Sequence, residues 1–179
     1  MKDILTQGLA QLDITPPPEA IDQLCRYAQL LVEQNKVMNL TAITDPEGIA
    51  RLHFLDSAAL LPLCGGAGGK SLIDVGTGAG FPGLVLKILC PELKLTLLDS
   101  LGKRVNWLSQ VARELDLKDV TCLHARAEEQ ALVKGYRDSF DLVTARAVAD
   151  LRLLSELCLP YAKVGGTFLS MKSVDSGEE

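Results

Sequence analysis

The chain has 179 residues, of which 47% are hydrophobic and 23% charged, a composition that fits a compact folded protein and excludes a disordered one. This length allows one full domain with its own core plus a smaller appendage, and no apolar run is long enough to cross a membrane. A net charge of −5 argues against indiscriminate nucleic-acid binding, five cysteines without a CxxC pair predict reduced thiols, and two histidines give no basis for a metal site.

The first 64 residues are predicted to form a small helical subdomain, 1–64. Polar and acidic residues in Met1–Gln7 stand where a secretory signal needs an unbroken apolar segment, so we expect the protein in the cytoplasm. Helical spacing of apolar residues and the acid-then-proline pair Asp45–Pro46 predict three helices. These helices cover residues 3–12, 19–34 and 45–61. A glycine-rich link, 65–69, opens the second domain, 65–179.

The third of these helices carries four polar residues within an apolar pattern, namely Arg51, His53, Asp56 and Ser57. His53 lies one turn from Asp56 and Ser57, so these three side chains can share a face. Two interpretations stay open from the spacing: a functional face, or a hydrogen-bonded cluster on the helix surface.

Two short apolar runs, Ser71–Val75 and Lys94–Asp99, flank a glycine-rich turn and a helical run. This order predicts a βαβ unit. Glycines at positions 76, 78, 80 and 83 let the backbone turn sharply and leave no Cβ atoms to hold a ligand off the main chain. Pro82 suits the first turn of the helix, where its missing N–H removes nothing.

Two acidic residues indicate which nucleotide this unit binds. Asp74 stands two residues before Gly76, where it would repel a phosphate and favour a cationic ligand, such as a sulfonium with an α-ammonium group. Asp99 ends the next strand and can accept hydrogen bonds from both hydroxyls of a ribose. A sugar and a cation without a phosphate describe S-adenosylmethionine.

Two alternatives remain for the same residues. The stretch Gly78–Gly83 also spells GxGxxG, the pattern of a dinucleotide site. An NAD-dependent oxidoreductase is therefore the alternative enzyme class, and Asp74 argues against it. A glycine-rich turn that only permits close packing of helix against sheet is the structural alternative, and Asp99 argues against that one.

The rest of the chain alternates strands and helices. Helices are expected after Leu101 and over residues 150–159, and strands over residues 120–124, 140–144 and 164–171. This alternation predicts an α/β protein with a doubly wound, mainly parallel sheet of the Rossmann type, whose ligands bind at the carboxyl ends of the strands. The residues expected to bind a cofactor at that edge are Asp74, Gly76, Gly78, Asp99, Ser100, Ala127, Glu128 and Arg146.

A loop over residues 125–129 is expected to lie beside an adenine ring. The Ala127 N–H could pair with a ring nitrogen, and the Glu128 carboxylate could accept from the exocyclic amine. Basic residues also gather after the βαβ unit, since residues 102–172 carry 11 basic and 9 acidic groups. Lys103, Arg104 and Lys172 could face a polyanion there, although scattered surface charge explains them equally well.

Six short motifs run along almost the whole chain: NLT at 39–41, HFLDS at 53–57, DVGTGAGFPG at 74–83, LDSLGKR at 98–104, ARAEE at 125–129 and ARA at 145–147. Many methyltransferases share the glycine loop, whereas the combination of GFPG, LDSLGKR and His-x-x-Asp-Ser is far more specific. Together the motifs resemble the ribosomal RNA small subunit methyltransferase G family, also called GidB.

The resemblance implies a class I S-adenosylmethionine-dependent methyltransferase that modifies N7 of a guanine in the decoding region (530 loop) of bacterial 16S ribosomal RNA. It implies 16S rRNA or the small ribosomal subunit as partner. We also expect no membrane association and a chain that acts as a monomer. Cofactor contacts are implied at Gly76, Phe81, Ala127, Glu128 and Arg146. Sheets of this class normally end in an antiparallel hairpin, but this chain stops at Ser176–Glu179, so we expect a truncated C-terminal sheet edge.

Guanine N7 has an in-plane lone pair and needs no deprotonation, so catalysis can rest on aligning it with the methyl–sulfur bond. The sequence has no Asn-Pro-Pro-Tyr run for amine methylation and no Pro-Cys motif for pyrimidine methylation. We expect Arg146 and His53 to be the catalytic candidates, and the RNA-binding candidates are Arg51, Lys103, Arg104 and Lys172. A non-catalytic RNA-binding or ribosome-assembly protein on the same scaffold is the remaining alternative.

Overall fold

The computed structural model describes residues 1–146 and 149–172. Its centre is a five-stranded sheet in the order β3-β2-β1-β4-β5, with every neighbouring pair parallel. The chain leaves β1 toward one edge and returns to continue toward the other, so the strand order reverses between β1 and β4, where open α/β sheets bind ligands. The strands are β1 (Ser71–Val75), β2 (Lys94–Asp99), β3 (Val120–His124), β4 (Phe140–Arg146) and β5 (Ala162–Met171). The predicted doubly wound α/β fold is confirmed.

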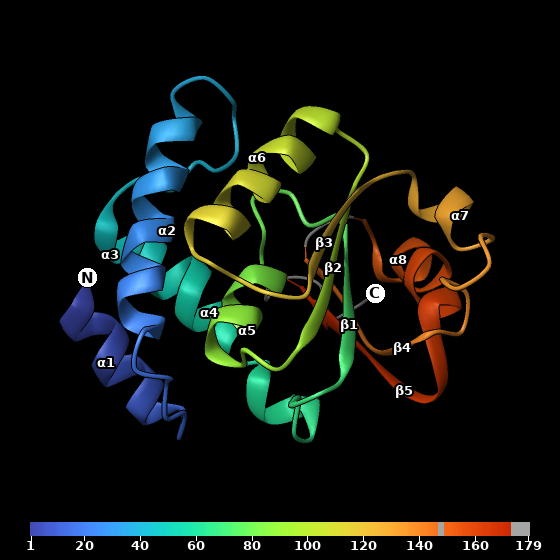
Figure 1. Cartoon of the computed structure of the whole chain (residues 1–179), viewed down its shortest axis with the longest axis horizontal. Coiled ribbons are helices and arrows are strands. Elements are labelled where there is room, and N and C mark those ends of the chain that lie inside the picture. Colours follow the sequence, from blue (N-terminus) through green and yellow to red (C-terminus); the bar gives the residue numbers. More distant parts are fainter. Residues whose placement is uncertain (147–148, 173–179) are drawn as a thin grey trace.

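Helices cover both faces of the sheet (Figure 1). The N-terminal helices, α5 and α6 lie on one side, and α7 and α8 lie on the other. The α-helices are α1 (Lys2–Gln11), α2 (Ala20–Asn35), α3 (Pro46–Gly48), α4 (Asp56–Ala58), α5 (Gly83–Leu89), α6 (Gly102–Glu114), α7 (Ala127–Gln130) and α8 (Leu151–Cys158). A π-helical stretch (Ile49–Leu55) joins α3 to α4, and short 3₁₀ turns cover Leu61–Cys64 and Leu159–Tyr161.

The strands supply two apolar cores because successive side chains point to opposite faces of a sheet. Leu72 and Leu95 belong to the core shared with α1, α2, α5 and α6. Ile73 and Leu98 belong to the core shared with α7 and α8. Leu24 and Leu31 of α2 lie in the first core, so residues before and after position 64 share one apolar interior. The division of the chain into 1–64 and 65–179 stays a prediction.

The helix expected over residues 45–61 is not a regular α-helix. It starts as expected, since Asp45 caps α3 by accepting a hydrogen bond from the Gly48 N–H at 2.7 Å, but the next seven residues are π-helical. His53 and Ser57 are buried, whereas Asp56 is exposed. The expected face shared by His53, Asp56 and Ser57 is therefore wrong in respect of Asp56.

The second half differs from expectation in one element, because part of the loop expected over residues 125–129 is the short helix α7. The expected truncation concerns residues 176–179, which lie outside the described residues. The last residue of the ARA motif, Ala147, also lies outside them. Within the described part of the chain, β5 forms one edge of the sheet. No helix there is long and apolar enough to cross a membrane.

Candidate functional site

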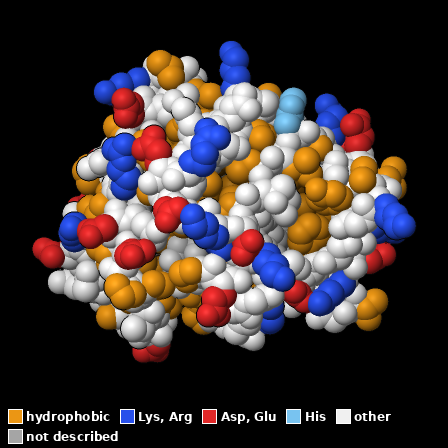
Figure 2. Space-filling model, in the orientation of Figure 1, with side chains coloured by type: hydrophobic (Ala, Val, Ile, Leu, Met, Phe, Trp, Pro, Cys, Tyr) orange, Lys and Arg blue, Asp and Glu red, His pale blue; other side chains and the backbone are white. Residues whose placement is uncertain are grey.

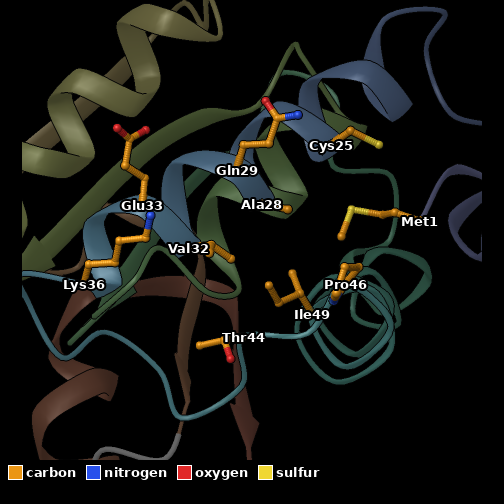
Figure 3. Close-up of a pocket in the computed structure, with 10 residues that line it drawn as sticks. All are labelled: Met1, Cys25, Ala28, Gln29, Val32, Glu33, Lys36, Thr44, Pro46 and Ile49. Atoms are coloured by element: carbon orange, nitrogen blue, oxygen red, sulfur yellow. The ribbon is translucent and has the colours of Figure 1, made fainter.

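Two cavities adjoin at the carboxyl ends of the strands. The Asp99 cavity, of about 240 Å³, is lined by residues following β1, β2 and β3, among them Asp99, Ser100, Ala127 and Glu128. The Arg146 cavity, of about 190 Å³, is lined by the glycine loop, Leu40, Thr41, His53, Phe81 and Arg146. Gly76 lines both, so the two cavities meet at the turn after β1. A third cavity, of about 510 Å³, lies between Met1, α2 and the segment from Thr44 to Ile49, and shares no lining residue with these two (Figure 3).

Asp74 anchors the glycine loop from inside the protein. Its carboxylate is fully buried and accepts hydrogen bonds from Thr77 Oγ1 at 2.7 Å, the Gly83 N–H at 3.0 Å and Thr144 Oγ1 at 3.1 Å. Burial raises the pKa of Asp74 to about 7, and these three hydrogen bonds work in the opposite direction.

The expectation that the Asp74 carboxylate faces a cationic ligand is therefore wrong for this geometry. Asp74 lines neither carboxyl-edge cavity, and all three of its partners belong to the chain itself. It fixes the shape of the loop that borders both cavities. Gly83 is needed beside it, because a Cβ there would lie 2.9 Å from Asp74 Oδ2.

A side chain from α2 holds the same loop from the other side. Tyr27 is fully buried, and its hydroxyl donates a hydrogen bond to the carbonyl oxygen of Ala79. Gly78 lies next to this point with φ +60°, and its Cβ position has no atom within 4 Å. The loop thus exposes bare backbone where it borders the cavity.

The Asp99 cavity has the features expected of a ribose site. Asp99 Oδ2 accepts from the Gly78 N–H at 2.9 Å, and Oδ1 accepts from the Leu101 N–H at 3.0 Å. Each carboxylate oxygen can accept a second hydrogen bond, so Asp99 can still take ligand hydroxyls. Arg104 Nη1 lies 3.7 Å from Asp99 Oδ1, which places this predicted RNA-binding residue beside the cavity instead.

The expected adenine-side residues lie in the same cavity. Ala127 begins α7, and its carbonyl accepts a hydrogen bond from the Tyr161 hydroxyl at 2.6 Å, which fixes where α7 starts. Glu128 is exposed and pairs with Arg126 at 2.9 Å. Ser100 is also exposed, and its carbonyl oxygen lies 3.0 Å from His124 Nε2.

The Arg146 cavity contains a compact polar and aromatic cluster. Arg146 Nη2 donates to His53 Nδ1 at 2.7 Å, and His53 Nε2 lies 2.7 Å from Thr41 Oγ1. The His53 ring stacks on Phe81 at 4.5 Å between centroids, and the Arg146 guanidinium lies 5.1 Å from the same ring. Burial lowers the pKa of Arg146, and the Nη1 atom has no hydrogen-bond partner among the described residues. The two catalytic candidates therefore meet, although 93 positions separate them in the sequence.

The predicted RNA-binding residues do not form one cluster. Arg51 is exposed and pairs with Glu47 at 2.9 Å, while His53 is buried, so the RNA-binding candidate and the catalytic candidate of this helix lie on different sides of it, as expected for residues two apart. Lys103 is exposed near the start of α6. Lys172 donates to the Ala149 carbonyl at 2.6 Å. Figure 2 shows basic and acidic side chains interspersed over the face it presents.

Sequence reasoning missed the residues that support the site from behind, which are Tyr27, Thr41, Thr77, Thr144 and Tyr161. Thr77 stands inside the glycine motif and Thr41 inside the NLT motif, so their positions gave a signal. Tyr27 and Tyr161 carry no local signal, because only the packing of distant elements brings them to the glycine loop and to α7.

The sheet order and the two carboxyl-edge cavities define a Rossmann-like protein of the class that includes the S-adenosylmethionine-dependent methyltransferases. A solved structure of a SAM-dependent methyltransferase from Aquifex aeolicus matches with a TM-score of 0.52 and 25% identity, covering 74% of this chain and 67% of that one. A putative S-adenosyl-L-methionine-dependent methyltransferase from Methanococcus maripaludis matches in fold alone, with a TM-score of 0.58 and 15% identity over 80% of this chain and 61% of that one.

The chain belongs to the rRNA small subunit methyltransferase G (GidB) family, whose family model matches residues 20–179. The ribosomal RNA small subunit methyltransferase G of Acetivibrio thermocellus is 48% identical over 179 residues, which are 100% of this chain and 73% of that protein. The protein of the same name from Geobacillus thermodenitrificans is 50% identical over 177 residues, covering 97% of this chain and 74% of that protein. The resemblance read from the motifs is confirmed.

Proposed function

We propose that the chain transfers a methyl group from S-adenosylmethionine to N7 of a guanine in the decoding region (530 loop) of bacterial 16S ribosomal RNA. The observation that carries this proposal is sequence identity: over nearly its whole length, the chain is 48% and 50% identical to two proteins named ribosomal RNA small subunit methyltransferase G. Since that substrate is ribosomal RNA, the proposal includes action in the cytoplasm, and the chain's action as a monomer stays a prediction.

The residues at the carboxyl edge fit the cofactor. Asp99 has free lone pairs for ribose hydroxyls, Gly78 leaves open space in front of the backbone, and Ala127 and Glu128 line the far end of the same cavity. The adjoining Arg146 cavity would take the methionine end, because Gly76 lines both spaces. When bound, the cofactor supplies an electrophilic methyl group on a sulfonium.

The chain's own residues then need only orient two reactants. Guanine N7 is already an in-plane lone pair in its ordinary protonation state, so no residue has to remove a proton. His53 fits this requirement, since its Nδ1 lone pair is already occupied by Arg146. In this proposal Phe81 and Arg146 wall the space in which the base and the methyl group meet.

Asp74 no longer argues against the dinucleotide alternative, because it lines neither carboxyl-edge cavity. What now supports the methyl donor is family membership together with Asp99 at the ribose position. Isothermal titration with S-adenosylmethionine and with NAD tests it. Binding of S-adenosylmethionine alone is expected, and binding of NAD alone would overturn the cofactor assignment.

Catalysis is tested by incubating the chain with methyl-tritiated S-adenosylmethionine and either naked 16S rRNA or small ribosomal subunits. Label in the RNA of either form is expected. Cofactor binding with no label in both forms would contradict an enzymatic role and favour an RNA-binding or assembly protein on the same scaffold.

A further inference from the structure

A chain of hydrogen bonds runs from the end of α2 to the end of β4. Asn35 closes the loop that follows α2, because its Oδ1 accepts from the Leu40 and Thr41 N–H groups at 2.8 and 3.0 Å. Its Nδ2 donates to the Thr41 carbonyl at 2.9 Å. Thr41 Oγ1 then meets His53, which in turn meets Arg146. The backbone of Thr41 is thus fixed at both its N–H and its carbonyl.

The donor capacity of each group determines where the protons lie. A guanidinium can only donate hydrogen bonds, so His53 Nδ1 must present a lone pair to Arg146. A neutral imidazole carries one proton, which must then be on Nε2. The 2.7 Å contact between His53 Nε2 and Thr41 Oγ1 is therefore a hydrogen bond that His53 donates and Thr41 accepts.

Thr41 is equipped for this role. Its Oγ1 also accepts from the Ile43 N–H at 3.0 Å, so both acceptor positions of the hydroxyl are occupied and only its own proton remains to be donated. The His53 ring cannot readily turn away, since it stacks on Phe81 at an interplanar angle of 15° and is only 3% exposed.

We propose that Thr41 is a positioning residue, which holds His53 in its neutral Nε2–H form and thereby orients Arg146 at the cavity. The guanidinium keeps Nη2 committed to His53 and holds the buried Nη1, which lacks a partner among the described residues, as the donor for an acceptor group of the bound reactants. His53 is in this view not a general base. The part of the inference that concerns Arg146 and catalysis rests on the proposed function, whereas the protonation state of His53 does not.

The electrostatic surroundings agree with this assignment. Burial and the neighbouring Arg146 lower the pKa of His53 to about 4, so the ring is neutral at physiological pH. Among the described residues, the charged and titratable groups that act on Arg146 besides His53 are Asp56, Tyr27 and Asp74.

Nuclear magnetic resonance of the ¹⁵N-labelled chain tests the protonation state directly. The chain has two histidines, so a His124→Gln variant assigns the signals. We expect the wild-type His53 ring to show a proton-bearing Nε2 and a bare Nδ1, unchanged between pH 8 and pH 5. A proton on Nδ1, or a ring that titrates near its ordinary pKa of about 6.5, would overturn the inference.

Variants of Thr41 separate positioning from mere structure. Thr41→Ser keeps the acceptor oxygen, Thr41→Val removes it, and Thr44→Val makes the same change on the exposed Thr44 in the same loop. Thr41→Val is expected to lower kcat about tenfold, the effect of about 1.4 kcal/mol on the barrier, and to disturb the His53 signals, while Thr41→Ser and Thr44→Val retain wild-type values.

Unchanged kcat and unchanged His53 signals in folded Thr41→Val would overturn the positioning role. If that variant does not fold, the wild-type and Thr41→Ser spectra still decide the protonation state. A chain without methyltransferase activity but with the expected His53 spectrum would refute the proposed function alone, so the two failures are distinguishable.

Discussion

Replacing Asp74 by Asn tests whether ionisation of the buried carboxyl that holds the glycine loop lowers the free energy of unfolding. The amide oxygen of Asn can accept from Thr77 and Gly83, and the amide N–H can donate to the Thr144 hydroxyl oxygen, so all three contacts have a counterpart. The variant differs mainly in having no group that titrates.

The expected magnitude follows from the pKa of Asp74, which is about 7 in the folded protein against an ordinary value of 3.8. Between these values the folded state binds more protons than the unfolded state, so the stability that the carboxyl contributes is fully present below its unfolded pKa and is lost as the pH rises through about 7. A shift of about three units corresponds to about 4 kcal/mol in total, of which about 2 kcal/mol falls between pH 5 and pH 7.

Urea unfolding of wild type and Asp74→Asn at several pH values measures this difference. Trp107 is the only tryptophan and is buried, so its fluorescence reports unfolding. The stability of wild type relative to the variant should fall by about 2 kcal/mol from pH 5 to pH 7. A difference that stays constant, or that rises with pH, would refute the raised pKa and mean that the three hydrogen bonds outweigh burial.

Three further changes address the loop, the cofactor and the RNA. Tyr27→Phe should lower the free energy of unfolding by about 1–2 kcal/mol, since the buried Ala79 carbonyl loses its donor; unchanged urea midpoints would argue against that hydrogen bond. Asp99→Ala should weaken S-adenosylmethionine binding by about 10- to 100-fold in calorimetry, because it removes the acceptor of the Gly78 N–H and of the proposed ribose hydroxyls; an unaltered Kd would exclude a ribose contact. Lys103→Ala should reduce the slope of log affinity for 16S rRNA against log salt by about one, whereas Lys118→Ala should not, since Lys118 follows the C-terminal end of α6 and pairs with Asp116; equal slopes in both variants would remove Lys103 from the RNA surface.

Local sequence patterns were sufficient for the fold and for the Asp99 side of the site. Apolar runs predicted each strand to within two residues of its observed bounds, and parallel strands then bring Asp99, Gly76 and Ala127 to one edge without further information. Gly78 and Asp99 were both predicted to bind the cofactor, and the Gly78 N–H donates a hydrogen bond to the Asp99 carboxylate.

The surroundings of Asp74 could not be predicted in this way, because they depend on the strand register. Asp74 and Thr144 are paired positions of β1 and β4, and this pairing supplies an internal partner 70 positions away. A local pattern gives the position of a carboxylate after a strand but not whether its oxygens are already occupied. That is why a ligand contact was expected where the protein has an anchor.

The surroundings of His53 could not be predicted from local spacing either, because this residue lies in a π-helical stretch. A regular period of 3.6 residues grouped His53 with Asp56, but residues 49–55 depart from that period. Only the packing of this stretch beside Phe81 brings His53 into contact with Arg146. The tertiary contact places His53 in the Arg146 cavity, and a functional role for it stays a prediction.

The proposed reaction is tested most directly by the chemical identity and place of the product. Small-subunit RNA is incubated with the chain and S-adenosylmethionine, cut with a nuclease, and the fragments are analysed by mass spectrometry. We expect one additional methyl group, recovered as 7-methylguanosine from the fragment that contains the 530 loop. A methyl group on another atom or another segment, or no methylation in RNA that lacks the modification beforehand, would contradict the proposed function.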